Sequence, residues 1–177
     1  MRKIMLWILV VIGGLIGLVL LLTLIGAFLP KDHVASRTLA LPQTSEAVWQ
    51  VITDFAQQPK WFSGVTSSER LPDQNGRARW REVFGGDMEA TLEVIEEQPP
   101  QRIVRKIVSD ELPFSGQWEY DIKPLATGCQ LTVTERGSVT NPFFRFMSRF
   151  VFGYNATIEK YLQSLAAKFG APAQISE

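Results

Sequence analysis

Three charged residues stand in strand-like segments at positions where period-two alternation predicts an apolar side chain. In three separate segments, the inward phase carries Glu82, Arg105 and Glu135. A buried charge must be paired or must lie near water. A Glu–Arg pair inside a cavity would orient the polar end of a ligand, and a carboxyl there could have a raised pKa and act as a general acid or base. The alternative is structural: each residue lies at a strand end near solvent, or a bulge shifts the phase.

Other reactive side chains are few. The single histidine, His33, follows Lys31 by two residues and is expected to be solvated, outside the domain proper. Without it, no Ser-His-Asp arrangement is expected inside the fold. The single cysteine, Cys129, excludes an intrachain disulfide and is expected to be inert at a turn or strand start. One His and one Cys do not make the usual structural zinc site. We therefore assign no catalytic residue, no metal and no cofactor.

Residues 65–138 alternate apolar and polar side chains and break at turn residues, which predicts an antiparallel meander. An earlier strand is expected at 34–41, and an amphipathic helix after Pro42. One face of the sheet is apolar and must be covered by another element. The breaks fall at residues 72–76, 85–86, 98–101 and 126–128.

The cover is expected at the C-terminal end of the chain. Asn141-Pro142 is a cap with proline in the first turn, and apolar side chains then follow at helical spacing as far as Phe169. The pattern predicts one helix of about 28 residues, which Gly170 ends and Gly153 bends. The predicted class is α+β, with a curved antiparallel sheet wrapped around one long terminal helix.

Large aromatic side chains fall on the inward faces of these elements. Rigid rings on a concave sheet under a single helix tend to leave space between them, and such pockets bind apolar ligands. Spacing alone does not separate this hollow from a fully packed core. The candidate lining is Trp80, Trp118, Tyr120, Phe146, Phe150 and Tyr154, with Glu82, Arg105 and Glu135 as polar anchors.

Residues 4–29 are 26 consecutive positions without a charge. As a helix they would be about 39 Å long, more than the roughly 30 Å hydrocarbon core of a bilayer. A cleaved signal peptide has a shorter apolar region followed by a small-x-small site. We therefore expect an uncleaved single-pass anchor in residues 1–30 and a folded domain in residues 31–177. The short basic tail before the span favours an extracytoplasmic domain, and Gly13 and Gly17 would let two spans approach closely in a homodimer.

The start of the terminal helix carries a second apolar edge. Phe144, Ser148 and Phe152 repeat at four-residue spacing off the core stripe, and Arg145 and Arg149 lie alongside them. Aromatic residues beside arginines suit a bilayer interface. The same residues could instead pack on the first helix or on a sheet edge.

Several segments also carry a resemblance to a known family. They are SRTLALP (36–42), SEAVW (45–49), Asp54-Phe55, Lys60-Trp61, LTVTE (131–135) and NPFFRF (141–146). In this order they resemble the START-like superfamily, also called SRPBCC, which includes polyketide cyclase/dehydrase-like proteins and pollen-allergen-like lipid binders. The likeness covers about residues 34–170 and implies a helix-grip fold: a curved seven-stranded antiparallel sheet around a long C-terminal helix, with a cavity suited to an apolar ligand. Such motifs identify the fold better than an activity.

The leading hypothesis is a single-pass membrane protein that binds a lipid or other hydrophobic small molecule in that cavity. One alternative is a cyclase or dehydrase that uses the same cavity, with Glu82 or Glu135 as acid or base and Tyr120 as a donor. Another is a membrane-tethered scaffold that binds partners through charged residues such as Arg77 on the outer sheet face. Nucleic acid is not expected as a partner, because residues 31–177 carry 16 basic and 18 acidic groups and no basic cluster.

Overall fold

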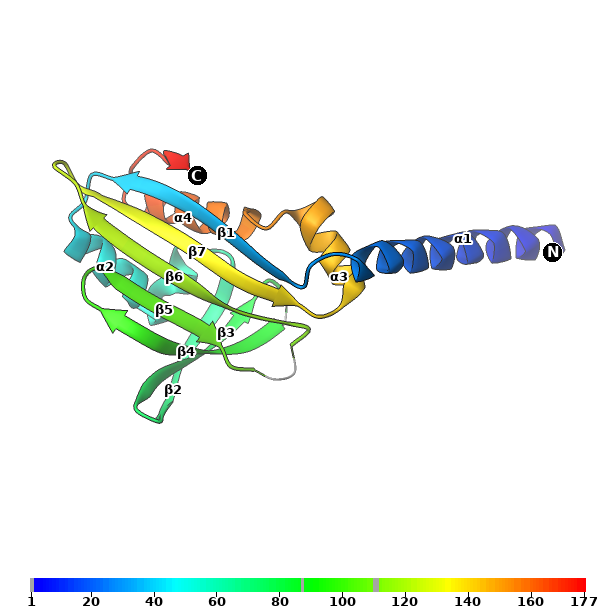
Figure 1. Ribbon diagram of the computed structural model, residues 1–177, viewed down its shortest axis with the longest axis horizontal. Coiled ribbons are helices and arrows are strands. Elements are labelled where there is room, and N and C mark those ends of the chain that lie inside the picture. Colours follow the sequence, from blue (N-terminus) through cyan, green and yellow to red (C-terminus); the bar gives the residue numbers. More distant parts are fainter. Residues whose placement is uncertain (1, 87, 110–111) are drawn as a thin grey trace.

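The computed structural model describes residues 2–86, 88–109 and 112–177, and it has an antiparallel sheet that curves around the C-terminal helices (Figure 1). The strands lie in the order β2-β3-β4-β5-β6-β7-β1-β8. The elements are α1 (Arg2–Ala27), β1 (Asp32–Leu41), α2 (Ser45–Thr53), a 3-10 turn (Phe55–Lys60), β2 (Val65–Gln74), β3 (Arg77–Phe84), β4 (Met88–Gln98), β5 (Arg102–Ile107), β6 (Phe114–Pro124), β7 (Cys129–Val139), α3 (Pro142–Met147), a π-helical turn (Ser148–Phe152), α4 (Ala156–Lys168) and β8 (Ile175–Ser176).

The predicted α+β class and the curved antiparallel sheet are confirmed, but the strand number is eight and not seven. The additional strand is β8, in which Ile175 and Ser176 pair with Leu39 and Thr38 of β1. Two residues give too short an alternation to be recognised as a strand from sequence. In the structure they extend the sheet beyond β1.

Local sequence explains how the meander turns. Asn75 and Gly76 have φ values of 53° and 76° between β2 and β3, as a two-residue hairpin turn of primed type requires. Thr44 caps α2 by accepting a hydrogen bond from the backbone N–H of Ala47. At the β6–β7 turn Gly128 has φ of 91°, and a Cβ there would lie 2.0 Å from the backbone oxygen of Leu41. These residues set the strand order that shapes the concave face.

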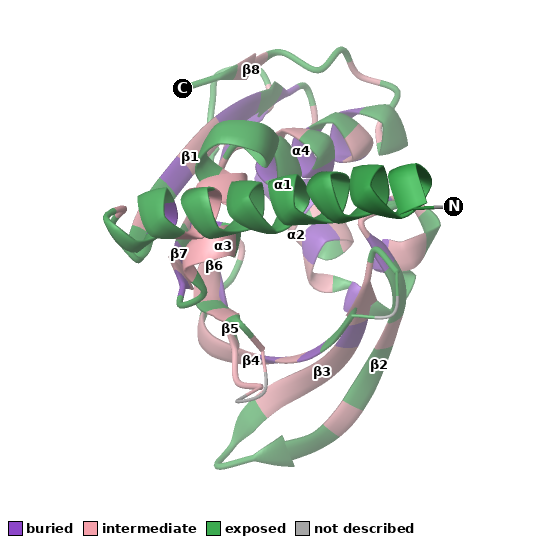
Figure 2. Cartoon of the chain, turned by 90° about the vertical axis from the view of Figure 1, so that its right-hand side faces the viewer, coloured by how far each residue is buried: buried purple, intermediate pink, exposed green. Residues whose placement is uncertain are grey.

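The hydrophobic core lies between α4 and the sheet, where α4 contributes four large, fully buried side chains besides Ala166. They are Ile158, Tyr161, Leu162 and Leu165. They pack against Leu39, Leu131 and Val133 of β1 and β7, which are also fully buried. Figure 2 shows the curved sheet from the α1 side, with its buried residues on the strands that face the helices. This half of the domain is tightly packed.

The C-terminal segment is not the single long helix that the sequence predicts. It begins with the short α3, continues as a π-helical turn, breaks at Gly153 with φ of 74°, and resumes as α4 at Ala156. Asn141 caps α3, since its side chain accepts hydrogen bonds from the backbone N–H groups of Phe143 and Phe144. Gly153 therefore breaks the helix, and the expected mild bend is wrong.

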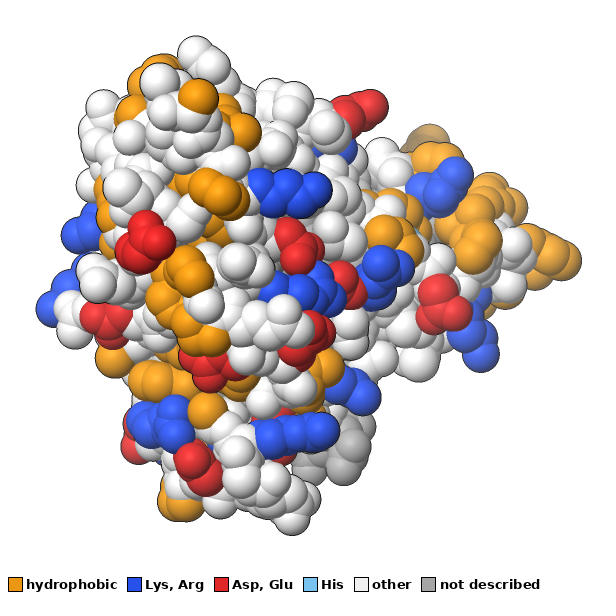
Figure 3. Space-filling model, turned by 60° about the vertical axis from the view of Figure 1, so that its left-hand side comes forward, with side chains coloured by type: hydrophobic (Ala, Val, Ile, Leu, Met, Phe, Trp, Pro, Cys, Tyr) orange, Lys and Arg blue, Asp and Glu red, His pale blue; other side chains and the backbone are white. Residues whose placement is uncertain are grey.

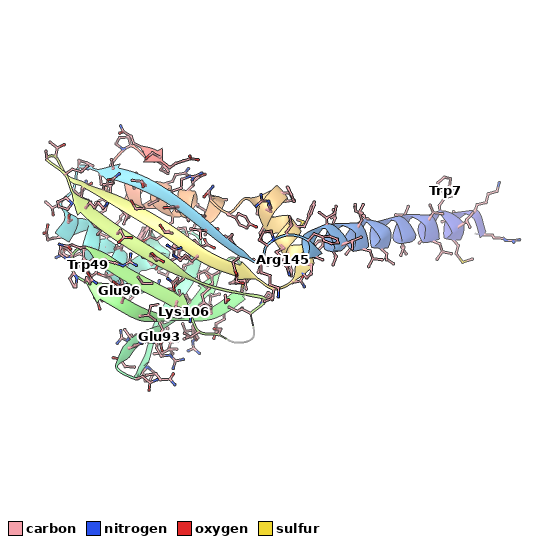
Figure 4. The ribbon with its side chains drawn as sticks, viewed as in Figure 1. Trp7, Trp49, Glu93, Glu96, Lys106 and Arg145 are labelled. Carbon is pink, nitrogen blue, oxygen red and sulfur yellow. The ribbon has the colours of Figure 1, made fainter. Side chains whose placement is uncertain are left out.

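The C-terminal end of α1 packs directly on α3. A Cβ on Gly26 would lie 1.9 Å from the backbone oxygen of Pro142, so the two helices touch backbone to backbone here. Arg145 of α3 reaches across this contact and donates to the carbonyl oxygens of Gly26 and Leu29, at 3.2 and 3.0 Å. Figure 4 shows Arg145 at the point where α1 meets the domain. Helix α1 and the domain are thus joined by specific contacts.

Candidate functional site

A cavity of about 690 Å³ lies between the concave face of the sheet and the segment from α3 to the start of α4. Strands β3 to β7 form its floor, and the broken part of the C-terminal segment forms its roof. Two glycines, Gly116 and Gly137, face each other across β6 and β7 and leave the floor without side chains at that point. The broken helix above the floor therefore leaves room for the cavity.

An ion pair between two buried residues lies at the inner end of the cavity. Arg105 Nη2 donates to Glu82 Oε1 at 2.5 Å, and the two side chains are only 2% and 1% exposed. The Arg105 guanidinium also lies 3.8 Å from the ring centroid of Phe55, a cation–π contact. The structure thus forms the Glu–Arg pair that the out-of-pattern charges predict. Both charges have a partner, which burial requires.

Two buried tyrosines lie next to this ion pair: Tyr120, which lines the cavity, and Tyr161 in the core behind it. The ring centroids of Tyr120 and Tyr161 are 5.7 Å apart, and Trp118 lies 5.8 Å from Tyr161. Burial raises the pKa of both Tyr120 and Tyr161 well above the usual phenol value. Their hydroxyl groups are therefore neutral at physiological pH and serve as hydrogen-bonding groups. Trp118 and Tyr120 line the cavity, as the sequence pattern predicts.

A second polar group lies nearer the α1 end and includes His33, where the sequence expectation is wrong. His33 is part of β1, its side chain is 10% exposed, and its Nε2 lies 3.5 Å from Glu135 Oε1. Its ring stacks on Tyr154 with centroids 4.0 Å apart and an interplanar angle of 11°. His33, Glu135 and Tyr154 all line the cavity.

The position of His33 follows from two features of β1 and β7. The strand begins two residues earlier than expected, and the alternation that buries Leu39 and Ala35 continues back to His33. Opposite His33, a Cβ on Gly137 would lie 2.4 Å from the imidazole Cε1, so the ring fits only because residue 137 is glycine. Within the described residues, His33 Nδ1 is buried and has no hydrogen-bond partner. Extending the alternation toward the N-terminus would have found this residue.

Three of the residues predicted to line the cavity lie elsewhere. Trp80 packs edge-on against Phe55 at 5.4 Å, and Phe146 contacts Phe150, which is 58% exposed. In their place the roof is formed by Phe144, Ser148 and Phe152, which the sequence pattern put on the opposite edge. The sequence pattern assigned side chains to faces as if the helix were continuous. The π-helical turn changes the rotation per residue, so the side chains of this segment point in other directions than an α-helix would give them.

The mouth of the cavity lies at the α1 end of the domain. Three of its lining residues are exposed large apolar side chains: Met88 at the start of β4, and Phe144 and Phe152 in the roof. The inner lining residues Glu82 and Arg105 are buried. In Figure 1 the β3–β4 turn and α3 lie at the end from which α1 projects.

The described residues include no cluster of three or more His, Cys, Asp or Glu side chains that could hold a metal ion. The cavity combines an apolar wall with an inner Glu–Arg pair and an outer His–Glu pair. Residues 33–170 match the sequence profile of the family described as polyketide cyclase / dehydrase and lipid transport. The chain belongs to this family.

Solved structures agree with this family assignment at the level of the fold. A START superfamily protein from Mycobacterium smegmatis is 19% identical, with a TM-score of 0.63, over 77% of this chain and 96% of that chain. The Zhui aromatase/cyclase from Streptomyces sp. R1128 is 15% identical, with a TM-score of 0.63, over 77% and 93%. A conserved protein from Geobacillus kaustophilus is 18% identical, with a TM-score of 0.64, over 82% and 100%. No curated protein matches this chain in sequence.

The outer face of this START-like sheet carries ion pairs between neighbouring strands. Arg81 pairs with Glu69 at 2.5 Å, and Arg77 pairs with Glu93 at 3.3 Å. Figure 3 shows basic and acidic side chains interleaved on the domain, whereas α1 projects as a largely hydrophobic rod. Arg77, considered for a scaffold, and Arg81 are therefore paired with adjacent carboxylates, which weakens them as contacts for a partner.

Proposed function

We propose that this protein holds a START-like domain at a membrane surface, where the domain binds one hydrophobic small molecule or lipid in its cavity. The observation that carries the proposal is the cavity of about 690 Å³ between sheet and helices. Pockets for small organic ligands are typically about 300–1,000 Å³ and mostly apolar. The family also includes lipid transport in its description.

Membrane anchoring through α1 is supported by its composition and by its joint with the domain. Among the described residues α1 is the one helix long and apolar enough to cross a membrane, and only Gly26 in it is buried. A signal peptide that is cleaved has no need of contacts with the mature domain. Here the carbonyl oxygens of Gly26 and Leu29 accept hydrogen bonds from Arg145. These contacts favour a retained anchor in residues 1–30.

The orientation and association of the anchor follow from its sequence. Arg2 and Lys3 on the short tail favour a cytoplasmic N-terminus and an extracytoplasmic domain. Gly13 and Gly17 have nothing within 4 Å of an added Cβ, so this face of α1 is free for a second copy. A homodimer through these glycines is part of the proposal.

Ligand binding would be driven by burial of apolar surface in the cavity. Each buried CH₂ contributes about 0.8 kcal/mol in the ideal limit, less the cost of ordering the ligand. We assign Trp118, Tyr120 and Tyr154 to the apolar wall. The Glu82–Arg105 pair and Glu135 supply the polar contacts at the two ends.

The proposal is tested by recovering the ligand from native membranes. Full-length protein is extracted into lipid nanodiscs without detergent, and bound molecules are identified by mass spectrometry. The control is Thr157→Trp, which places an indole into the cavity from an exposed lining position of α4. A matched variant, Ala167→Trp, adds the same ring at an exposed position of α4 outside the cavity.

We expect one class of apolar molecule to be enriched with wild type and Ala167→Trp relative to Thr157→Trp, because only the last fills the cavity. Bulk nanodisc lipid is common to all three preparations and cancels in the comparison. Equal recovery from all three would count against the proposal.

A second candidate, an enzyme of the cyclase or dehydrase kind, is favoured by the outer polar group. Glu135 contacts His33 inside the cavity, so a carboxylate and an imidazole face the same space. Glu82 is a weaker candidate for proton transfer, since it is 1% exposed and held by Arg105. An enzyme would convert the molecule recovered above, and Glu135→Gln would abolish that conversion without unfolding the domain. Unchanged composition of the ligand after incubation would instead favour a carrier.

A further inference from the structure

Five large apolar side chains are exposed around the joint between α1 and the domain, and we call them the apolar rim. They are Phe28 at 84%, Phe144 at 47%, Phe150 at 58%, Val151 at 58% and Phe152 at 62% exposure. Large apolar side chains exposed in one region mark an interaction site on a soluble domain. Two of the five, Phe144 and Phe152, also line the cavity. The rim and the mouth of the cavity are therefore one surface.

The rim is held at the end of α1 by Arg145. Its side chain is largely buried and makes four hydrogen bonds to backbone carbonyl oxygens. Two of these acceptors, Gly26 and Leu29, belong to the end of α1 and the link after it. The other two, Val139 and Thr140, belong to the end of β7 and the link to α3.

This arrangement uses the fixed fork of a guanidinium, which presents five donors in one plane. The carbonyl oxygens at a helix C-terminus lack partners within the helix, and a positive charge there also interacts favourably with the helix dipole. Arg145 therefore satisfies the end of α1 and fixes its direction relative to α3. Gly26 allows the close approach, as a Cβ would clash with Pro142.

The joint sets the depth of the rim. If α1 spans the bilayer, its C-terminal end lies at the interface, and Phe28 follows Ala27 directly. Phe144 is adjacent to Arg145 and is held at the same level. Aromatic rings beside basic groups, here Lys31 and Arg149, are the side chains that membrane interfaces favour.

We propose that the apolar rim is immersed in the interfacial layer of the bilayer and that the cavity opens into the leaflet where α1 ends. The ligand is then an amphiphile taken directly from that leaflet, without passing through water. This rests on the proposed cavity binding and adds the source and class of the ligand. A bilayer is favoured over a protein partner because the span α1 leaves the domain from the rim itself.

The test measures immersion of the rim in the full-length chain. A cysteine is introduced by Phe152→Cys and labelled with the environment-sensitive fluorophore NBD, in nanodiscs of phosphatidylcholine. The matched control is Ala126→Cys in the exposed β6–β7 turn, at the opposite end of the sheet from α1 (Figure 1). Cys129 is fully buried, and wild type treated identically measures its background labelling.

We expect NBD at position 152 to be blue-shifted and strongly quenched by phosphatidylcholine spin-labelled near the top of its acyl chain, while NBD at position 126 shows neither effect. Weak quenching at 152, equal to that at 126, would overturn the proposal. A blue shift at 152 without quenching by the spin-labelled lipid would assign the rim to a second copy or another protein and would also overturn it.

A second pair of variants tests the role of the joint. Arg145→Lys keeps the charge but loses the fork, and we expect it to reduce the quenching at position 152 several-fold. Arg149→Lys, an equivalent change on the π-helical turn, should leave the quenching unchanged. If Arg145→Lys and Arg149→Lys changed the quenching at position 152 equally, Arg145 would not set the depth of the apolar rim in the bilayer.

The outcomes separate this inference from the proposed function. Suppose that the rim is quenched by lipid but that wild type recovers no more of any molecule than Thr157→Trp. The proposed ligand binding would then be wrong, and the membrane contact of the rim would stand. A ligand-loaded cavity with an unquenched rim would mean that the ligand enters from water.

Discussion

The two halves of the C-terminal segment cover the same sheet in opposite ways. Helix α4 buries Tyr161, Leu162 and Leu165 completely, whereas the π-helical turn leaves Phe150 and Phe152 more than half exposed. The difference arises at Gly153, where the chain leaves the helix and resumes it at Ala156. One half provides stability and the other leaves a hollow. A binding fold of this kind needs both, because a cavity is kept open only by a packed region next to it.

The largest effect is expected from the ion pair at the border of the two halves. Arg105→Leu leaves the carboxylate of Glu82 buried without its partner and should lower the free energy of unfolding by about 3–5 kcal/mol. The double variant Arg105→Leu with Glu82→Leu should recover much of this loss, since no charge then remains buried. Denaturant unfolding of the full-length protein in micelles measures both. A single variant as stable as wild type would show that water reaches the pair.

The packed half and the roof of the hollow should respond differently to loss of a side chain. Leu162→Ala removes a fully buried side chain and should cost about 2–5 kcal/mol. Phe152→Ala removes a larger but exposed side chain and should change stability by no more than about 0.5 kcal/mol. The same unfolding measurement compares them. Similar losses in both variants would mean that the roof is packed like α4.

Within the hollow, the floor should be sensitive to one added carbon. Gly137→Ala places a Cβ against the imidazole of His33 and should cost about 1–3 kcal/mol through overpacking. The imidazole would move away from Glu135 and Tyr154. The chemical shifts of the single histidine, followed by NMR with labelled imidazole, report this movement. Unchanged shifts together with unchanged stability would show that β7 yields at this position.

The smallest effect concerns Glu119 on the outer face, where the sheet has no hollow. Burial tends to raise the pKa of Glu119, but hydrogen bonds from Gln117, Arg136 and Arg102 outweigh it and hold the pKa below the usual value of 4.5. Because the folded-state pKa is lowered, the carboxylate contributes stability above the unfolded-state pKa, and this contribution is lost as pH falls through the folded-state value.

We therefore expect Glu119→Gln to lower the free energy of unfolding near neutral pH. The variant should also lose less stability than wild type as the pH falls below about 4.5. Glu97→Gln, at an exposed position of β4, is the matched control and should leave the acid limb of the stability profile as in wild type. Unfolding midpoints measured across acidic pH test this. Identical profiles for the two variants would contradict the role of the hydrogen bonds.

Alternation and turn residues were sufficient to predict the sheet apart from β8, because a half-buried strand exposes its period directly in sequence. The same alternation brought out Glu82 and Arg105 as buried charges, and their pairing follows from the physical need for a partner. The C-terminal part of the predicted terminal helix is present as α4, where Ile158, Leu162 and Leu165 follow one helical face.

The roof could not be predicted in the same way. A helical period assigns side chains to faces only while the helix continues, and the π-helical turn and Gly153 interrupt it before Tyr154. Phe146 and Phe150 were therefore assigned inward, although Phe144 and Phe152 line the cavity. His33 was missed for another reason: the expected strand began at residue 34, one residue after His33, and the space for its ring depends on Gly137 of a distant strand.

The stiff connection at Arg145 links the domain to the thickness of the lipid layer. If α1 spans a bilayer as proposed, its 26 residues form a helix about 39 Å long, which must tilt to fit a hydrocarbon core of roughly 30 Å. Because the guanidinium leaves little freedom between α1 and α3, the domain tilts with the helix. In that case thinner and thicker membranes would set different angles of the cavity mouth against the lipid headgroups.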